Sequence, residues 1–371
     1  MSTKIFTGRS VYDAALERIR WLFDEFPSVT VGFSGGKDST VILNLALQVA
    51  EEKGRLPLTV KFVDQEAEWQ ATIDYVRTVM YDDRVDPLWV QAPLKLSNAT
   101  STEDDWLWCW NPEEEWIRDK DPIAVKENRW GVDSFHDLLK EILKQEHPEG
   151  HAIDLTGMRC EESPARFHSL TKMQTYKHIT WGLKTDARRD IYAFHPIYDW
   201  SFRDVWKAIH ENDWAYNRIY DEFYRYGINP YEMRVSNVHH QTAVRWLYIM
   251  QEVEPETWEK LTRRLSGINT AGQLQEEFNK VDTLPWMFTS WKEYREHLLD
   301  NLISDPEHVA WYRNRFDSGD ARYHGAGKVL DKLHRLHCNM LLVNDRYGVK
   351  LATFDTSHAK HLAKNRRRND N

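Results

Sequence analysis

The sequence predicts an α/β protein whose core is a doubly wound parallel sheet, followed by a helical region. Predicted strands and helices alternate from about residue 10 to residue 215, which is typical of parallel βαβ units. Three of these strands end on polar or glycine-rich turns, at Ser34, Asp64 and Gly157. From these patterns we expect an α/β domain over residues 1–235, interrupted at about 98–150, and a helical region over 236–371.

The composition limits the classes of protein to which this chain can belong. Charged residues make up 29% of the 371 residues and the net charge is −9, which argues against a wholly basic nucleic-acid-binding surface. No apolar run approaches the ~18 residues of a membrane span, and the N-terminus lacks the apolar core of a signal peptide. Three distant cysteines (Cys109, Cys160, Cys338) fit a reducing cytoplasm and are too few for a four-cysteine iron–sulfur or zinc site. We therefore expect a cytoplasmic protein without an iron–sulfur cluster and without a membrane partner.

The first predicted elements surround a glycine turn. Ser10 and Asp13 form a capping pattern for a helix that continues to Phe26. The β-branched and aromatic run 29–33 then predicts a buried strand, and apolar residues at a helical spacing predict a helix over 38–52. Ser34-Gly35-Gly36 separates this strand from this helix.

A strand, a glycine turn and a helix start are the components of an anion site. The N–H groups of the first helical turn lack partners within the helix, and the helix dipole favours negative charge there. Lys37 adds charge, while Ser34 and Ser39 add hydroxyl donors. The spacing is not that of a Walker A loop, because Lys37 directly follows the glycine pair. A turn that only reverses the chain is the alternative interpretation.

The next elements continue the alternation. The run 58–63 predicts a second strand that ends on Asp64, followed by a helix to about Met80 and a third strand over 86–90. Ligands of such sheets lie beyond the carboxyl ends of the strands, where Ser34 and Asp64 stand.

Residues 98–150 interrupt this rhythm. The segment is acidic, contains Pro112 and Pro122, and carries five tryptophans: Trp106, Trp108, Trp110, Trp116 and Trp130. Both a substrate-side lid and an ordinary packed excursion are consistent with this pattern.

A fourth strand, 152–156, leads into a second glycine turn that begins at Gly157. Arg159, Glu162 and Arg166 follow it. The planar guanidinium group suits phosphate oxygens. Salt bridges on a solvated helix are the alternative for these charges.

Several motifs together resemble a known superfamily. Ser34-Gly35-Gly36-Lys37-Asp38-Ser39 resembles the PP-loop of the adenine-nucleotide α-hydrolase superfamily, which includes ATP pyrophosphatases and phosphoadenylyl-sulfate (PAPS) reductases. Gly157-x-Arg159, Glu162-Ser163 and Arg166 resemble the second motif of the PAPS reductase family. The run 194–206 resembles a third motif, which we interpret as mainly architectural, and Asn229-Pro230-Tyr231 resembles a fourth. The resemblance covers about residues 25–235.

This resemblance implies a nucleotide site. ATP is expected to place its pyrophosphate in the Ser34–Ser39 loop and its adenine near Asp64, with Mg²⁺ held partly by Asp38. Lys37, Asp38 and Arg159 are the expected catalytic residues. The expected nucleotide-binding residues are Ser34, Gly35, Gly36, Lys37, Asp38, Ser39, Asp64, Gly157, Arg159, Glu162 and Arg166.

The reaction expected from the resemblance is cleavage of ATP between the α- and β-phosphates, giving AMP or an adenylylated acceptor and pyrophosphate. The reductases use a Glu-Cys-Gly-Leu-His motif that this sequence lacks, since Cys338 stands in Leu336-His337-Cys338-Asn339. A PAPS reductase or sulfotransferase-like activity stays open. So does a regulatory subunit acting with a ParB-like partner, because the chain also looks like the group that includes the immunoglobulin-binding regulator A proteins. The acceptor (sulfate, a nucleic-acid base or a protein group) and a role in sulfur modification also stay open.

The remaining candidates are cysteines, histidines and the C-terminal tail. Cys109 and Cys160 are either reactive thiols or small packed residues. His239-His240 and the group His334, His337, Cys338 suggest zinc, but no fourth ligand is evident. Helices are expected over 238–250, 254–265, 290–302, 306–316 and 327–342. The basic tail 360–368 is expected either to contact nucleic acid or to be a solvated terminus.

Overall fold

The computed structural model describes residues 7–98, 106–186, 188–235, 246–265, 281–303 and 305–342, and eleven single positions: 100, 238, 239, 243, 267, 268, 345, 351, 354, 355 and 358. The chain divides into two compact units. The first consists of Met1–Leu96 and Trp108–Asn237, and the second of Ser97–Leu107 and Val238–Asn371. The basic tail 360–368 and His240 lie outside the described residues.

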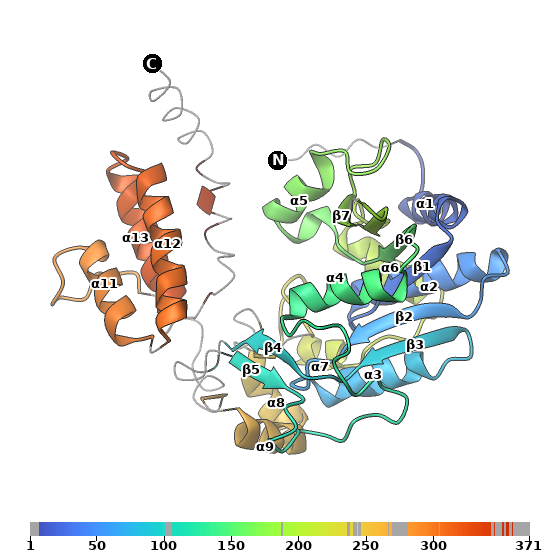
Figure 1. Cartoon of the computed structure of the whole chain (residues 1–371), viewed down its shortest axis with the longest axis horizontal. Helices are drawn as coiled ribbons and strands as arrows, with labels where there is room; N and C mark the ends of the chain where they lie inside the picture. The colour runs from blue at the N-terminus through green and yellow to red at the C-terminus, as the bar shows by residue number, and fades with distance from the viewer. Residues whose placement is uncertain are drawn as a thin grey trace. The chain divides into compact units, whose positions relative to one another are not determined.

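A six-stranded sheet is the centre of the first unit (Figure 1). Its strand order is β3-β2-β1-β6-β8-β7, and all neighbours are parallel except β7, which is antiparallel to β8. The strands that lead to Ser34, Asp64 and Gly157 are therefore parallel, which confirms the predicted doubly wound sheet. The bounds are β1 Ser28–Gly32, β2 Leu58–Val63, β3 Val85–Val90, β6 Ala152–Leu155, β7 Gly182–Asp186 and β8 Ile191–Phe194.

Helices cover both faces of this sheet. Four helices contribute to one continuous apolar core on the first face: α1 (Val11–Glu25), α2 (Lys37–Glu52), α3 (Gln70–Met80) and α6 (Phe202–Glu211). On the opposite face, Leu143 of α4 (Phe135–Glu146) packs on Ala152 and Ile191. From β1 the chain first adds β2 and β3 on one side of the sheet and then returns to add β6 on the other side of β1. The strand order therefore reverses between β1 and β6. Ligands of open α/β sheets bind in the crevice at such a switch point.

Shorter elements complete the first unit. Ser10 caps α1 by accepting a hydrogen bond from the N–H of Tyr12. The single-turn helix η1 (Cys160–Glu162) and α5 (Pro164–Thr171) follow β6, and α7 (Ile219–Arg225) follows α6. β4 (Leu94–Ser97) and β5 (Trp106–Cys109) form a two-stranded sheet.

From Val238 onward, the described regular elements of the second unit are helices. It contains α8 (Leu247–Val253), α9 (Pro255–Arg264), α11 (Trp291–Asn301), α12 (Pro306–Arg322) and α13 (Lys328–Leu342). The predicted start of a helix at Val238 is wrong, because Val238 and His239 form a turn. The predicted end at Phe316 is also wrong, because α12 continues to Arg322. Among the described helices, none is long and apolar enough to cross a bilayer.

Candidate active site at the carboxyl edge of the sheet

The glycine turn after β1 has the geometry of an anion-binding loop. Gly35 has φ +69°, and a Cβ there would lie 2.8 Å from Cγ2 of Thr72, so both the conformation and the close approach to α3 require glycine. Gly36 is the N-cap of α2 and supplies no side-chain cap. The start of α2 is therefore open at its N–H groups, apart from the contact of Lys37 described below.

Hydroxyl groups hold this loop in place. The Ser39 hydroxyl donates to the carbonyl of Gly36 at 2.9 Å and accepts from the N–H of Ser34 at 3.3 Å. The Ser34 and Ser39 hydroxyl oxygens lie 3.1 Å apart. The Thr40 hydroxyl donates to the same carbonyl at 3.0 Å and contacts the Tyr75 hydroxyl. The two predicted serines therefore shape the loop, and the one O–H of Ser39 is already donated to the carbonyl of Gly36.

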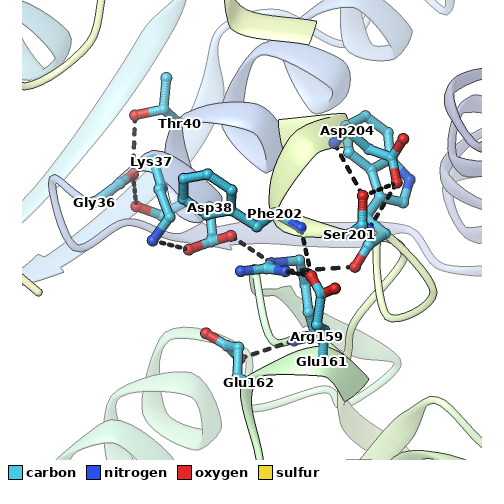
Figure 2. Close-up of polar contacts among 12 residues, drawn as sticks. Gly36, Lys37, Asp38, Thr40, Arg159, Glu161, Glu162, Ser201, Phe202 and Asp204 are labelled. Carbon is cyan, nitrogen blue, oxygen red and sulfur yellow. Dashed lines mark hydrogen bonds and ion pairs between the residues drawn. The ribbon is translucent and has the colours of Figure 1, made fainter. Parts of the chain in front are cut away.

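Lys37, Asp38 and Arg159 form a charged chain beside the loop (Figure 2). Nζ of Lys37 lies 3.1 Å from Oδ2 of Asp38, and Nε of Arg159 donates to Oδ1 of Asp38 at 2.6 Å. Lys37 and Arg159 are buried, at 8% and 4% exposure. Gly157 makes the approach of the two segments possible, since a Cβ there would lie 2.7 Å from the carbonyl carbon and oxygen of Asp38.

The cations of the site are paired within the protein. Arg159 also contacts Glu161 at 3.2 Å, and Glu162 accepts from the N–H of Arg159 at 3.0 Å while pairing with Arg166. Three cations (Lys37, Arg159 and Arg166) thus face three carboxylates (Asp38, Glu161 and Glu162). A bound phosphate chain must replace some of these carboxylates as partners of the cations. Each cation stays stabilised in the exchange, because a phosphate oxygen is also an anionic partner.

The pairing also fixes the protonation of the two buried cations. Burial works to lower the pKa of Lys37, but Tyr220 and Asp38 outweigh it and the pKa is raised. Burial acts in the same direction on Arg159, and Asp38 again outweighs it, so that its pKa is also raised. Both groups therefore remain charged at neutral pH.

Sequence patterns did not identify the residues that support this loop from α7. The Tyr220 hydroxyl accepts from the N–H of Lys37 at 3.1 Å, and its ring lies 5.5 Å from Nζ of Lys37. Asn217 is fully buried and donates to the carbonyl of Gly35 at 3.2 Å and to the Thr72 hydroxyl at 2.8 Å. The contacts of Tyr220 and Asn217 with the loop span 183 and 182 positions, so the spacing of residues in the sequence gives no sign of them.

Asp64 lies at the end of β2 as its position predicts, but its side chain is fully buried. Its carboxylate accepts from the N–H of Glu66, the indole of Trp89, the amide of Gln91 and the guanidinium of Arg118. Each oxygen thus already accepts two hydrogen bonds. The hydrogen bonds that the Asp64 carboxylate accepts therefore come from protein donors, and they hold the end of β2 in place.

The interrupting segment supplies part of this burial. The indole of Trp110 donates to the carbonyl of Asp64 at 2.8 Å, and its backbone N–H donates to Glu66 at 2.5 Å. Cys109 donates to the carbonyl of Gln65 at 3.0 Å and is buried. Residues 109–118 are therefore fixed on the end of β2 by specific contacts.

The other histidines and cysteines singled out in the sequence contact neighbouring protein groups. His334 contacts Asp320 at 2.9 Å, His337 contacts Arg295 at 3.2 Å, and the thiol of Cys338 donates to the carbonyl of Trp291. Within the described ranges, no three His, Cys, Asp or Glu side chains are grouped so as to hold a metal ion. Burial raises the pKa of Cys338 to about 12, and Cys160, beside Arg159, is partly exposed.

Comparison with known proteins places these observations in a family. A model described as phosphoadenosine phosphosulfate reductase domain matches residues 28–226, and a domain of unknown function (DUF3440) matches residues 227–347. The chain is 27% identical over 388 residues to the uncharacterized protein YbdN of Escherichia coli K12, covering 96% of this chain and 94% of that protein. It is 22% identical over 221 residues to an adenosine 5'-phosphosulfate reductase of Lysinibacillus sphaericus, covering 59% of this chain and 79% of that protein.

Solved structures include two matches of low similarity. The FMN adenylyltransferase of Candida glabrata gives a TM-score of 0.36 at 16% identity, covering 58% of this chain and 62% of that chain. A PAPS reductase of Candida auris in its phosphate complex gives a TM-score of 0.31 at 16% identity, covering 60% and 94%. The family model covers more than half of the sequence. The chain therefore belongs to the phosphoadenosine phosphosulfate reductase family.

Proposed function

We propose that this protein binds ATP at the Ser34–Ser39 loop and cleaves it between the α- and β-phosphates, transferring the adenylyl group to an acceptor. The observation that carries the proposal is the pair of buried cations, Lys37 and Arg159, held on either side of Asp38 at the open start of α2. Fixed positive charge at a helix start stabilises a pyrophosphate leaving group without reorganisation during the reaction.

The roles follow from position. Lys37 and the N–H groups of α2 bind the β- and γ-phosphates, and Arg159 offsets the charge at the α-phosphate when an acceptor oxygen attacks the phosphorus. The bond between that phosphorus and the bridging oxygen breaks, and pyrophosphate leaves with the electron pair. Glu162 of η1 accepts from the N–H of Arg159 and pairs with Arg166 of α5, so these two residues support the turn that carries Arg159.

In this proposal, Mg²⁺ binds together with ATP. Mg²⁺ prefers oxygen ligands and usually needs only one or two carboxylates beside phosphate oxygens and water. Asp38 is the carboxylate closest to Lys37, at 3.1 Å, and both its oxygens are held by cations. The residues fit an ion that ATP brings with it and that neutralises phosphate charge beside Asp38.

Two of the three cysteines are poorly placed for a thiol-dependent reduction of PAPS. Cys109 and Cys338 are buried and donate to backbone carbonyls. Cys160 is the partly exposed one of the three and lies next to Arg159, so a thiol-dependent reaction would depend on it.

Product analysis tests the proposal. The wild-type protein is incubated with ATP, Mg²⁺ and candidate acceptors, and AMP, ADP and pyrophosphate are resolved. Pyrophosphate together with an adenylylated acceptor or AMP, lost in Lys37→Ala and retained in Lys53→Ala, is the expected result. Lys53 is the matched control because it ends the same helix and pairs with Asp24, away from the loop.

Other products would change the assignment. ADP with phosphate would show ordinary ATPase chemistry and contradict the proposal. Turnover of PAPS with a thiol donor, lost in Cys160→Ser, would establish a reductase instead. Tight ATP binding with no turnover would favour a regulatory subunit.

A further inference from the structure

A second group of polar residues lies on one face of the sheet, on β1, β2 and β6 and directly after β6. Gly32 pairs with Lys61, and Thr30 pairs with Asp154. Because side chains alternate along a strand, these residues and Thr156 share the face opposite the core that α1 and α2 cover. Nζ of Lys61 and Oδ2 of Asp154 lie 2.5 Å apart, so this pair is fixed.

Thr156 directly follows β6, at the carboxyl edge of the sheet. Its Cγ2 would lie 3.1 Å from a Cβ on Gly32, so its methyl group is turned toward β1. Its hydroxyl is turned the other way, and Oγ1 lies 2.6 Å from Nδ1 of His195. The next residue, Gly157, packs on the backbone of Asp38, so Thr156 adjoins the phosphate loop. Thr156 is only half-buried, so a ligand can reach it.

His195 determines the direction of this hydroxyl. The side chain is 1% exposed, and burial together with Arg166 lowers its pKa to about 4, so the ring is neutral at pH 7. A neutral ring carries one N–H, and in the described structure Nε2 is buried without a hydrogen-bond partner. A buried N–H without an acceptor is rarer than a buried acceptor without a donor. The proton therefore belongs on Nδ1, which donates to Oγ1 of Thr156.

This assignment leaves the hydroxyl hydrogen of Thr156 directed away from His195. We propose that Thr156 donates this hydrogen to a phosphate oxygen of the bound nucleotide, and that His195 is the positioning residue that sets its direction. The inference rests on the proposed nucleotide site and adds a ligand-binding residue to it. Phosphate oxygens are the acceptors expected here because the switch point between β1 and β6 adjoins Asp38 and Arg159.

Calorimetry with ATP tests the role of Thr156. Thr156→Val should weaken ATP binding about 10-fold or more, since hydrogen bonds to charged groups are the strong ones, while Thr156→Ser should bind like the wild type. Thr30→Val is a matched control. Thr30 lies on the same face, is 2% exposed and has its hydroxyl 3.3 Å from Nε2 of His147, but it stands on β1 away from the sheet edge. Its ATP affinity should equal that of the wild type.

NMR of ¹⁵N-histidine-labelled full-length protein tests the role of His195. One of the 16 histidines should show a protonated Nδ1 and an unprotonated Nε2 from pH 6 to 8, and this signal should be lost in His195→Gln. Adding ATP should shift it in the wild type but not in Thr156→Val. Removing the ring with His195→Leu should weaken ATP binding, and adding Thr156→Val to that variant should weaken it no further.

The outcomes separate this inference from the proposed function. No ATP binding by the wild-type protein overturns both. Wild-type affinity in Thr156→Val, beside weakened binding in Lys37→Ala, overturns the role of Thr156 and leaves the proposed ATP site standing. A proton found on Nε2 overturns the role of His195, because the Thr156 hydroxyl would then donate to the ring.

Discussion

The Nε of Arg159 donates a hydrogen bond to Oδ1 of Asp38 at 2.6 Å, across a separation of 121 residues in the sequence. This contact joins the turn after β6 to the turn after β1, on the two sides of the switch point in the sheet. It also means that the carboxylate proposed to meet Mg²⁺ already neutralises a buried guanidinium. In the proposed nucleotide site, phosphate oxygens would replace some of the carboxylates that these cations contact here.

Asp38→Asn separates these two roles. Without magnesium, the variant should bind ATP at least as tightly as the wild type, because Arg159 and Lys37 lose a competing anion. The strengthening of ATP binding by Mg²⁺ should disappear, and each tenfold loss corresponds to about 1.4 kcal/mol. Calorimetry with and without Mg²⁺ measures both effects. Asp24→Asn, on an exposed partner of Lys53, is the control; magnesium enhancement that persists in Asp38→Asn would remove Asp38 as a metal ligand.

Tyr220→Phe tests the support of the loop from α7. The change removes the acceptor of the Lys37 N–H and keeps the buried ring, so it should cost about 1–3 kcal/mol of stability. Thermal unfolding of the full chain measures the loss. Tyr216→Phe removes a partly exposed hydroxyl bonded to Asp221 and should cost less than half as much. Equal losses in the two variants would show that the contact of Tyr220 with Lys37 has no particular importance.

Gly157→Ala tests the close approach of the two turns. The added Cβ would lie 2.7 Å from backbone atoms of Asp38, so a whole segment must move, at a cost of about 1–3 kcal/mol. ATP affinity should fall as the Arg159 guanidinium is displaced from Asp38. Gly319→Ala is a useful comparison, because its Cβ would meet side chains and no backbone, Leu333 at 3.3 Å and His337 at 3.5 Å, and alanine favours helix α12. Unchanged ATP binding in Gly157→Ala would argue against this packing requirement.

The second unit should lose stability as the pH falls. Burial and the adjacent Arg295 lower the pKa of His337 to about 2, and Asp320 and His334 also face this ring. Because the folded-state pKa is below the unfolded value of about 6.5, the stabilisation is complete above pH 6.5. It is lost toward pH 2, by up to about 1.4 kcal/mol per pH unit.

Tryptophan fluorescence during thermal unfolding between pH 7.5 and 5.5 measures this dependence. Trp291 and Trp311 pack in the apolar cluster that contains Phe316, and the Phe316 ring stacks on His337. His337→Gln keeps an acceptor for Arg295 and should flatten the pH dependence, leaving the part contributed by His195. His297→Gln, at an exposed position of α11, should behave like the wild type. A wild-type slope in His337→Gln would contradict the prediction.

Local patterns determined much of the fold. The β-branched run before Ser34, the paired glycines and the apolar spacing after Lys37 predict a strand, a turn and a helix, which are β1, the loop and α2. The helix start at Pro306 was also readable, because Asp305 caps it by accepting from the N–H of Glu307. The end of α12 was not, because packing of its last turns, with Phe316 and Tyr323 fully buried, extends it beyond the apolar pattern.

The sequence by itself determined which residues form the loop proposed to bind phosphate, because the conformation of a turn and the start of a helix depend on near neighbours such as Gly35 and Lys37. Tertiary structure alone decided what those residues contact. It buried Asp64 beneath Trp89, Gln91 and Arg118, placed the Tyr220 hydroxyl on the N–H of Lys37, and put His195 beside Thr156. Hydrogen bonds between distant segments depend on how strands are ordered in the sheet, and no local periodicity records that order.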